Sequence, residues 1–189
     1  CENQPDDAFK VNVEGTLNLI KRISQTSLKI IFLSSGHVFD GMEMNYGDNH
    51  PTAPSTVYGI HKKFVEDEIK SLTDNFLVLR LSKIYGIKKG DKTIFDEAAH
   101  CISNGKQVLA ASDQYFCPTY IHDLIKAILT IQELDLIGYM NLCAPEVWSR
   151  FEMQKKLAQS MGRDESLVKK IKLYDIPEMI GRPLNTSMV

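Results

Sequence analysis

The sequence predicts an α/β fold, in which a doubly wound parallel sheet is followed by a smaller mixed α/β lobe. Two apolar runs without alternation, residues 29–35 and 76–86, are typical of strands that a parallel sheet buries on both faces. Each run follows a stretch with helical periodicity, residues 4–24 and 55–73. Because parallel neighbours need crossover connections, this alternation of helix and strand favours right-handed units of a doubly wound sheet.

The two predicted helices of this first half each have one apolar face. Pro5, followed by two aspartates, gives the composition that the first turn of a helix favours. Apolar side chains then recur on one face of the first helix at Phe9, Val13, Leu17 and Ile20. The second helix repeats the pattern at Val65, Ile69 and Leu72. We expect both faces to pack against the sheet.

The second half of the chain is less regular. Helices are predicted over residues 93–105, 119–134 and 149–162, and short strands over 107–110 and 138–144. Thr119 is a candidate N-cap, and Ser149 with Glu152 forms a capping box. We therefore divide the chain into residues 1–86, which carry the main strands, and residues 87–189, a lobe that includes the remaining sheet elements.

Composition excludes several classes of partner. The net charge of -2 gives no basic footprint for nucleic acid or an anionic membrane. No stretch approaches the roughly 18 unbroken apolar residues of a membrane span. The 4 cysteines are scattered without a C-x-x-C pair, and the 5 histidines show no metal-ligand spacing. The sequence therefore predicts reduced thiols, a cytoplasmic protein and no structural metal.

Candidate ligand-binding residues mark the ends of the two predicted strands. Ser34 and Ser35 end the first strand, and Ile84 and Tyr85 end the second. Open parallel sheets bind ligands at the carboxyl ends of their strands. We therefore expect these residues to lie at one cleft.

Tyr58 and Lys62 are candidates for acid-base chemistry at this cleft. They are four residues apart on the helix between the strands, so they share a helix face. A nearby ammonium favours the phenolate and lowers the tyrosine pKa from its usual value of about 10. Tyr85 and Lys89 have the same spacing but lie in a predicted loop, so we interpret that pair as accidental. Spacing alone leaves open that Tyr58 is only an amphipathic residue at a helix start.

Four segments carry a resemblance to a known family. They are FLSSGHVFDG, YGIHK, LRLSKIYG and SDQYFCPTYIHDL, in that order. The sequence resembles the extended short-chain dehydrogenase/reductases, and most of all their dTDP-4-dehydrorhamnose reductase (RmlD-like) branch, whose D-Q-x-x-x-P-T-x-x-x-D-L pattern is similar to the last segment. The resemblance implies the C-terminal part of a Rossmann-type doubly wound sheet with a small substrate lobe.

The resemblance also implies roles for the candidate residues. Ser35 takes the place of the catalytic hydroxyl, Tyr58 that of the acid-base, and Lys62 that of the residue that binds the nicotinamide ribose. The implied cofactor is NADH or NADPH, contacted by Ser34, Ser35, Tyr58, Lys62, Ile84 and Tyr85.

The implied substrate is a nucleotide sugar, contacted by His37, Cys117, Thr119 and Arg182. The Arg182 guanidinium is expected to pair with the diphosphate through its bidentate fork. Alternatives stay open for three of these residues: a solvated loop side chain for His37, a buried small apolar one for Cys117, and an ordinary surface charge for Arg182.

The chain departs from the family pattern in two ways. No glycine-rich turn for a dinucleotide pyrophosphate stands in the sequence. We therefore expect a fragment without the first βαβ units, and a 189-residue polypeptide that is inert and does not bind NAD(P) on its own. Gly36 and His37 stand where the branch has Asp and Tyr, which leaves the sugar open and argues against a dehydratase.

Three functions are consistent with the resemblance. The first is an NAD(P)-dependent reductase of a nucleotide-sugar 4-keto group, and the second is a nucleotide-sugar 4-epimerase with the same triad. The third is a non-catalytic subunit that resembles methionine adenosyltransferase β.

A second apolar stripe on the Tyr58 helix, Val57, Ile60 and Phe64, predicts a homodimer.

Overall fold

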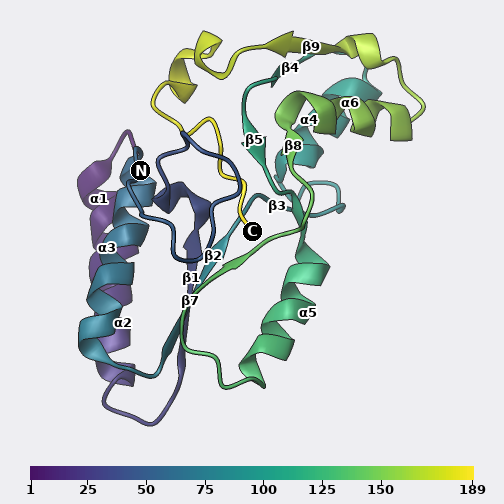
Figure 1. The fold of residues 1–189 in the computed structure, drawn as a ribbon. Helices are drawn as coiled ribbons and strands as arrows, with labels where there is room; N and C mark the ends of the chain where they lie inside the picture. Colours follow the sequence, from purple (N-terminus) through teal and green to yellow (C-terminus); the bar gives the residue numbers. More distant parts are fainter.

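The computed structural model describes residues 1–189 and has a three-stranded parallel sheet at its centre (Figure 1). The strand order is β1 (Ile30–Ser35), β2 (Phe76–Leu81), β7 (Gly138–Leu142). Ser35, the last residue of β1, pairs with Leu81, the last residue of β2. The parallel α/β architecture predicted from the apolar runs is confirmed.

Helices cover both faces of this sheet (Figure 1). On one face lie α1 (Pro5–Phe9), a π-helical turn (Lys10–Gly15), α2 (Thr16–Ile23) and α3 (Val57–Leu72). Their apolar side chains pack on Ile30, Phe32, Phe76 and Val78. On the other face, α5 (Ile121–Gln132) packs on Leu77, Leu79 and Leu81. The fully buried β2 explains the second apolar run, whereas burial alternates along β1 and Leu33 is 43% exposed, so the expectation that β1 is buried on both faces is wrong.

The rest of the chain forms a smaller lobe beside the sheet (Figure 1). It contains α4 (Ile94–Ser103), β4 (Val108–Ala111), α6 (Arg150–Ser160) and β9 (Val168–Ile171). The strands β4 and β9 pair in parallel, and the apolar sides of α4 and α6 pack with them. The capping box of Ser149 and Glu152 at the start of α6 is confirmed.

Short strand pairs connect the lobe to the sheet. They are β3 (Ile84–Tyr85) with β6 (Thr119–Tyr120), in parallel, and β5 (Tyr115–Phe116) with β8 (Trp148–Ser149), antiparallel. Two local predictions are wrong here. The strand expected over 76–86 breaks after Leu81, and Thr119 lies in β6 instead of capping α5, whose N-cap is Tyr120.

None of the helices is long and apolar enough to cross a membrane.

Candidate active site

A cavity of about 270 Å³ opens at the carboxyl ends of β1 and β2. It is lined from the sheet side by Ser35, Gly36, His37, Tyr58, Leu81, Ser82, Lys83 and Ile84, and from the lobe side by Gln114, Phe116, Arg150, Arg182 and Thr186. Because ligands of open α/β sheets bind at this end of the strands, the cavity is the candidate site.

Ser35 and Tyr58 face this cavity together. Both side chains line its wall, and the Ser35 hydroxyl acts to lower the pKa of Tyr58. Burial has the larger effect and leaves the pKa of Tyr58 above its usual value. Tyr58 is therefore protonated at neutral pH and equipped to donate a proton.

A glycine brings Tyr58 close to the end of β1. A Cβ atom on Gly59 would lie 2.2 Å from the His37 carbonyl oxygen, so no larger residue fits without moving the backbone. The N-cap Thr56 accepts a hydrogen bond from the Gly59 amide and fixes the start of α3. The rings of His37 and Tyr58 then meet edge to face, with centroids 6.0 Å apart.

Lys62 lies on the same helix face but does not tune Tyr58 as expected. Its Nζ donates a hydrogen bond to the Leu33 carbonyl oxygen at 2.9 Å and lies 5.7 Å from the centroid of the Tyr58 ring. The expected lowering of the Tyr58 pKa is not found, because burial outweighs the other influences on the phenol. Burial also lowers the pKa of Lys62, which Glu66 partly offsets.

Ser34 does not line the cavity with Ser35. Its hydroxyl donates a 2.5 Å hydrogen bond to Oε1 of Glu66, which is 1% exposed. Successive side chains of a strand point to opposite faces, so only one of two adjacent serines can reach the ligand side. The structure thus places Ser34 in a buried network and not at the expected cofactor position.

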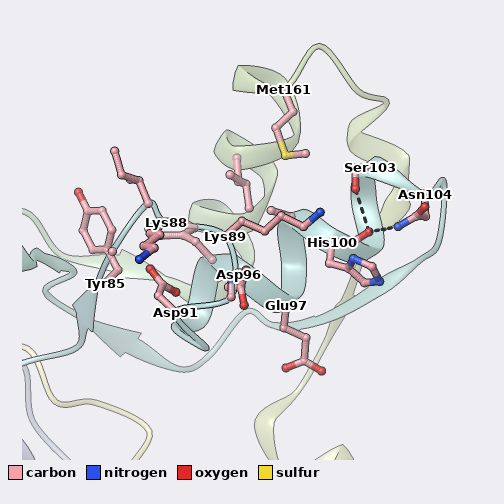
Figure 2. Close-up of a pocket in the computed structure, with 16 residues that line it drawn as sticks. Tyr85, Lys88, Lys89, Asp91, Asp96, Glu97, His100, Ser103, Asn104 and Met161 are labelled. Atoms are coloured by element: carbon pink, nitrogen blue, oxygen red, sulfur yellow. Dashed lines mark hydrogen bonds between the residues drawn. The ribbon is translucent and has the colours of Figure 1, made fainter.

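Ile84 and Tyr85 are separated in the same way. Ile84 lines the candidate cavity, whereas Tyr85 lines a larger cavity of about 940 Å³ between the 86–91 loop, α4 and α6. Figure 2 shows Tyr85 in this second cavity with Lys88 and Lys89, and its ring packs edge-on against Phe95. The structure does not bring Tyr85 to the predicted cofactor site.

The four predicted substrate residues divide into two pairs. His37 and Arg182 line the cavity. The His37 ring is partly buried with an unpartnered Nδ1 atom, so it is not the solvated side chain of the alternative interpretation. Burial lowers the pKa of His37 to about 4, with further lowering by Lys83 and Arg182.

Cys117 and Thr119 are buried outside the cavity. The Thr119 hydroxyl donates to the Cys117 carbonyl oxygen and accepts from the Ala144 amide, so it is fully engaged in the backbone. Cys117 is a buried small side chain, as its alternative interpretation proposed, and its thiol contacts the Met188 carbonyl oxygen. The predicted contact of these two side chains with substrate is therefore not supported.

Sequence reasoning missed five polar residues of the cavity: Ser82, Lys83, Gln114, Arg150 and Thr186. The Arg150 Nε donates a 2.8 Å hydrogen bond to Oε1 of Gln114, which orients the guanidinium. Lys83 belongs to the segment LRLSKIYG, which carries the family resemblance, and lies two residues after the end of β2. Its position at a strand end was the available signal.

Comparisons with known proteins agree with this architecture. The dTDP-4-dehydrorhamnose reductase of Sinorhizobium fredii is 28% identical and aligns with 100% of this chain and 67% of its own length. Methionine adenosyltransferase 2 subunit beta of Pongo abelii is 28% identical over 99% of this chain and 58% of its own length.

Among solved structures, the dTDP-4-dehydrorhamnose reductase of Bacillus anthracis, in complex with NADP, superposes with a TM-score of 0.91. It is 24% identical, and the match covers 100% of this chain and 66% of that one. The chain thus spans about two thirds or less of the length of these relatives. The model of one family, the RmlD substrate binding domain, matches residues 1–189, and the chain belongs to that family.

Proposed function

We propose that the intact protein is an NAD(P)-dependent reductase of the 4-keto group of a nucleotide sugar, as the names of its dTDP-4-dehydrorhamnose reductase relatives suggest. One observation carries the proposal: Ser35 and Tyr58 open onto a cavity whose other wall has Arg150 and Arg182. A proton donor for a carbonyl oxygen thereby lies beside cations that suit a diphosphate.

The residues present fit the nicotinamide end of a dinucleotide. Ile84 supplies an apolar wall, and Lys62 holds its ammonium between the Leu33 carbonyl oxygen and the Tyr58 ring, where a ribose hydroxyl would find a donor. NADH or NADPH would supply the hydride when bound. In this proposal Ser35, Tyr58, Lys62 and Ile84 form the cofactor contacts.

The chain's own contribution is to hold the carbonyl oxygen and to protonate it. Ser35 is placed to donate a hydrogen bond to that oxygen while Tyr58 transfers its proton to the developing alkoxide. The raised pKa of Tyr58 suits this direction, because the phenol stays protonated until the much more basic alkoxide forms. His37, neutral at pH 7, adds a hydrogen-bonding group without adding charge.

The alternatives have less support. A 4-epimerase would use the same residues, and no feature of the cavity favours it. The similarity to a methionine adenosyltransferase β subunit does not favour a non-catalytic role over a reductase. Both the β subunit and a reductase relative are 28% identical to this chain.

The proposal is tested with the intact protein, a dTDP-4-keto-6-deoxy sugar and NADPH, by following nicotinamide absorbance. We expect oxidation of NADPH, and a loss of turnover by a factor on the order of 10² or more in Tyr58→Phe, with substrate affinity nearly unchanged. Tyr85→Phe is the matched control, since Tyr85 has the same spacing to a lysine but lines the other cavity. Turnover of Tyr58→Phe within a few-fold of the parent protein would remove Tyr58 from the mechanism.

We also propose that the intact protein is a cytoplasmic homodimer that associates through α3 and the helix before it. Ile60 and Phe64 on α3 are 50% and 42% exposed, and Val11 and Leu19 on the preceding helix are exposed as well. Exposed apolar side chains on two adjacent helices suit a self-complementary interface. Light scattering at micromolar concentration should give the mass of a dimer, and Phe64→Glu should shift it to a monomer; a monomer before substitution would refute the proposal.

A further inference from the structure

The backbone of Arg150 is fixed where two elements of the lobe meet. Arg150 follows β8 and is the first residue of α6, which begins with the capping box of Ser149 and Glu152. The strand β8 pairs with β5 in antiparallel fashion, and in continuation of this pairing the Arg150 amide donates a 3.0 Å hydrogen bond to the Gln114 carbonyl oxygen. Residues that lie opposite each other in such a pair carry their side chains on the same face.

The side chain of Arg150 is held at one of its three nitrogen atoms. Nε donates a 2.8 Å hydrogen bond to Oε1 of Gln114, whereas Nη1 and Nη2 have no hydrogen-bond partner in the chain. Arg150 also forms no salt bridge. The bond at Nε therefore restrains the planar guanidinium and leaves its outer edge, Nη1 with Nη2, available to two oxygen atoms of a ligand.

Arg80 shows the opposite arrangement in the same chain. All three of its nitrogen atoms donate hydrogen bonds: Nε and Nη2 to the Glu66 carboxylate, and Nη1 to the Asp48 carbonyl oxygen. A carboxylate orients a guanidinium and also neutralises it. The amide of Gln114 orients Arg150 without cancelling its charge.

No acidic side chain compensates Arg150 inside the cavity. None of the 13 residues that line it is an aspartate or glutamate. Burial lowers the pKa of Arg150, and the charge of Arg182 lowers it further, against an opposing influence of Glu97 from outside the cavity. An anion in the cavity would relieve the cost of this uncompensated charge.

The two arginines of the cavity differ in how they are held. Arg182 is bonded through its backbone, because its amide donates to the Met179 carbonyl oxygen and its carbonyl oxygen accepts from the Tyr174 hydroxyl. Its guanidinium has no partner comparable to Gln114. Arg150 is therefore the cation whose direction is set before a ligand binds, and a group set in advance loses less conformational freedom on binding.

We propose that Gln114 is a positioning residue for the diphosphate of the substrate, which holds the Arg150 guanidinium as a neutral acceptor and leaves its full charge to the ligand. This role rests on the proposed function, because the diphosphate is that of a nucleotide sugar. The proposal also explains the residue type. A glutamate at position 114 would orient Arg150 as well, but it would take up the charge that the diphosphate needs.

Calorimetric binding of dTDP to the intact protein tests this role without turnover. We expect Gln114→Ala to weaken binding roughly fivefold to tenfold, on the order of one hydrogen bond. Gln114→Glu should weaken it roughly tenfold or more although it keeps an acceptor for Nε. Its midpoint of urea denaturation should stay near that of the parent protein, which separates the loss of affinity from a loss of fold.

A double-mutant cycle shows whether Gln114 acts through Arg150. In an Arg150→Ala background, Gln114→Ala should cause no further loss of dTDP affinity. In an Arg182→Ala background, which is the matched control, Gln114→Ala should keep its full effect.

The outcomes separate this role from the proposed function. Equal losses from Gln114→Ala with and without Arg150, or parent-like dTDP affinity in Gln114→Glu, would overturn the role of Gln114 and leave the proposed reductase intact. A parent protein that does not bind dTDP would overturn the proposed function together with this role.

Discussion

Two groups of charged residues at the end of β2 differ in whether their charges are paired. Arg80 forms a bidentate ion pair with Glu66 of α3, at 2.8 Å from Nη2 to Oε2, with both side chains almost fully buried. Lys83, three residues later, faces a cavity with two arginines and no acidic residue. A paired buried charge holds structural elements together, whereas a gathered unpaired charge is available to a ligand.

The paired group connects α3 with each of the three strands of the central sheet. Ser34 of β1 donates to Glu66, Arg80 of β2 donates to the Asp48 carbonyl oxygen, and the Tyr139 hydroxyl of β7 donates to the Glu66 carbonyl oxygen. Glu66 lies one helical turn after Lys62 on α3. Fixing Glu66 therefore fixes the helix that carries Tyr58 against the strand that carries Ser35.

Breaking the paired group should give the largest effect on stability. Glu66→Leu leaves the Arg80 guanidinium buried without a counter-charge, and we expect the free energy of unfolding to fall by about 3–5 kcal/mol. Urea denaturation measures this loss. The double variant Glu66→Leu/Arg80→Met should recover most of it, because no charge is then left buried alone. A single-variant loss of less than about 1 kcal/mol would mean that the pair is not structural.

The sequence predicted the elements whose signals are local. The unalternating runs predicted β1 and β2, and the pair Ser149 and Glu152 predicted the start of α6. The break after Leu81 was not predictable, because Ser82 and Lys83 accept hydrogen bonds from the Cys117 and Thr119 amides, far along the chain. The strand β9 was missed because two of its four side chains are exposed lysines, and only its pairing with β4 makes it a strand.

The same division holds for the candidate site: residues with a local signal were predictable, and residues brought in by the tertiary fold were not. A strand end and a helix spacing made Ser35 and Tyr58 candidates, the family resemblance selected them, and the structure places both at one cavity. The assignment of Ser34 and Tyr85 failed because adjacent strand residues point to opposite sides, and the pattern did not say which side faces the ligand. Arg150 comes from the lobe, and only the tertiary fold carries it to the end of β2.

A second prediction concerns the unpaired group and its influence on His37. The pKa of His37 lies at about 4, so between about pH 4 and 6.5 the unfolded chain binds a proton that the folded chain does not. The folded state should therefore lose roughly 1–2 kcal/mol as the pH falls through this range, after allowance for partial exposure. His37→Gln should remove this part of the pH dependence.

Nuclear magnetic resonance titration of the imidazole measures the cause directly. Lys83→Met removes the positive charge with the larger influence on His37 and should move the pKa of His37 upward, toward 6.5, while burial keeps it below that value. A His37 that titrates near 6.5 in the parent protein would show that the cationic group does not act on it.

The smallest effect is expected for a pair of charges beside Glu66 on the same helix. Lys63 and Asp67 form an ion pair at i and i+4, but their side chains are 28% and 48% exposed. Water already stabilises both charges there, so Asp67→Asn should change the free energy of unfolding by less than about 0.5 kcal/mol. Urea denaturation of Asp67→Asn and Glu66→Leu in parallel compares adjacent carboxylates that differ mainly in burial. Similar losses of unfolding free energy in the two variants would contradict the prediction. They would show that burial does not determine how much an ion pair contributes to stability.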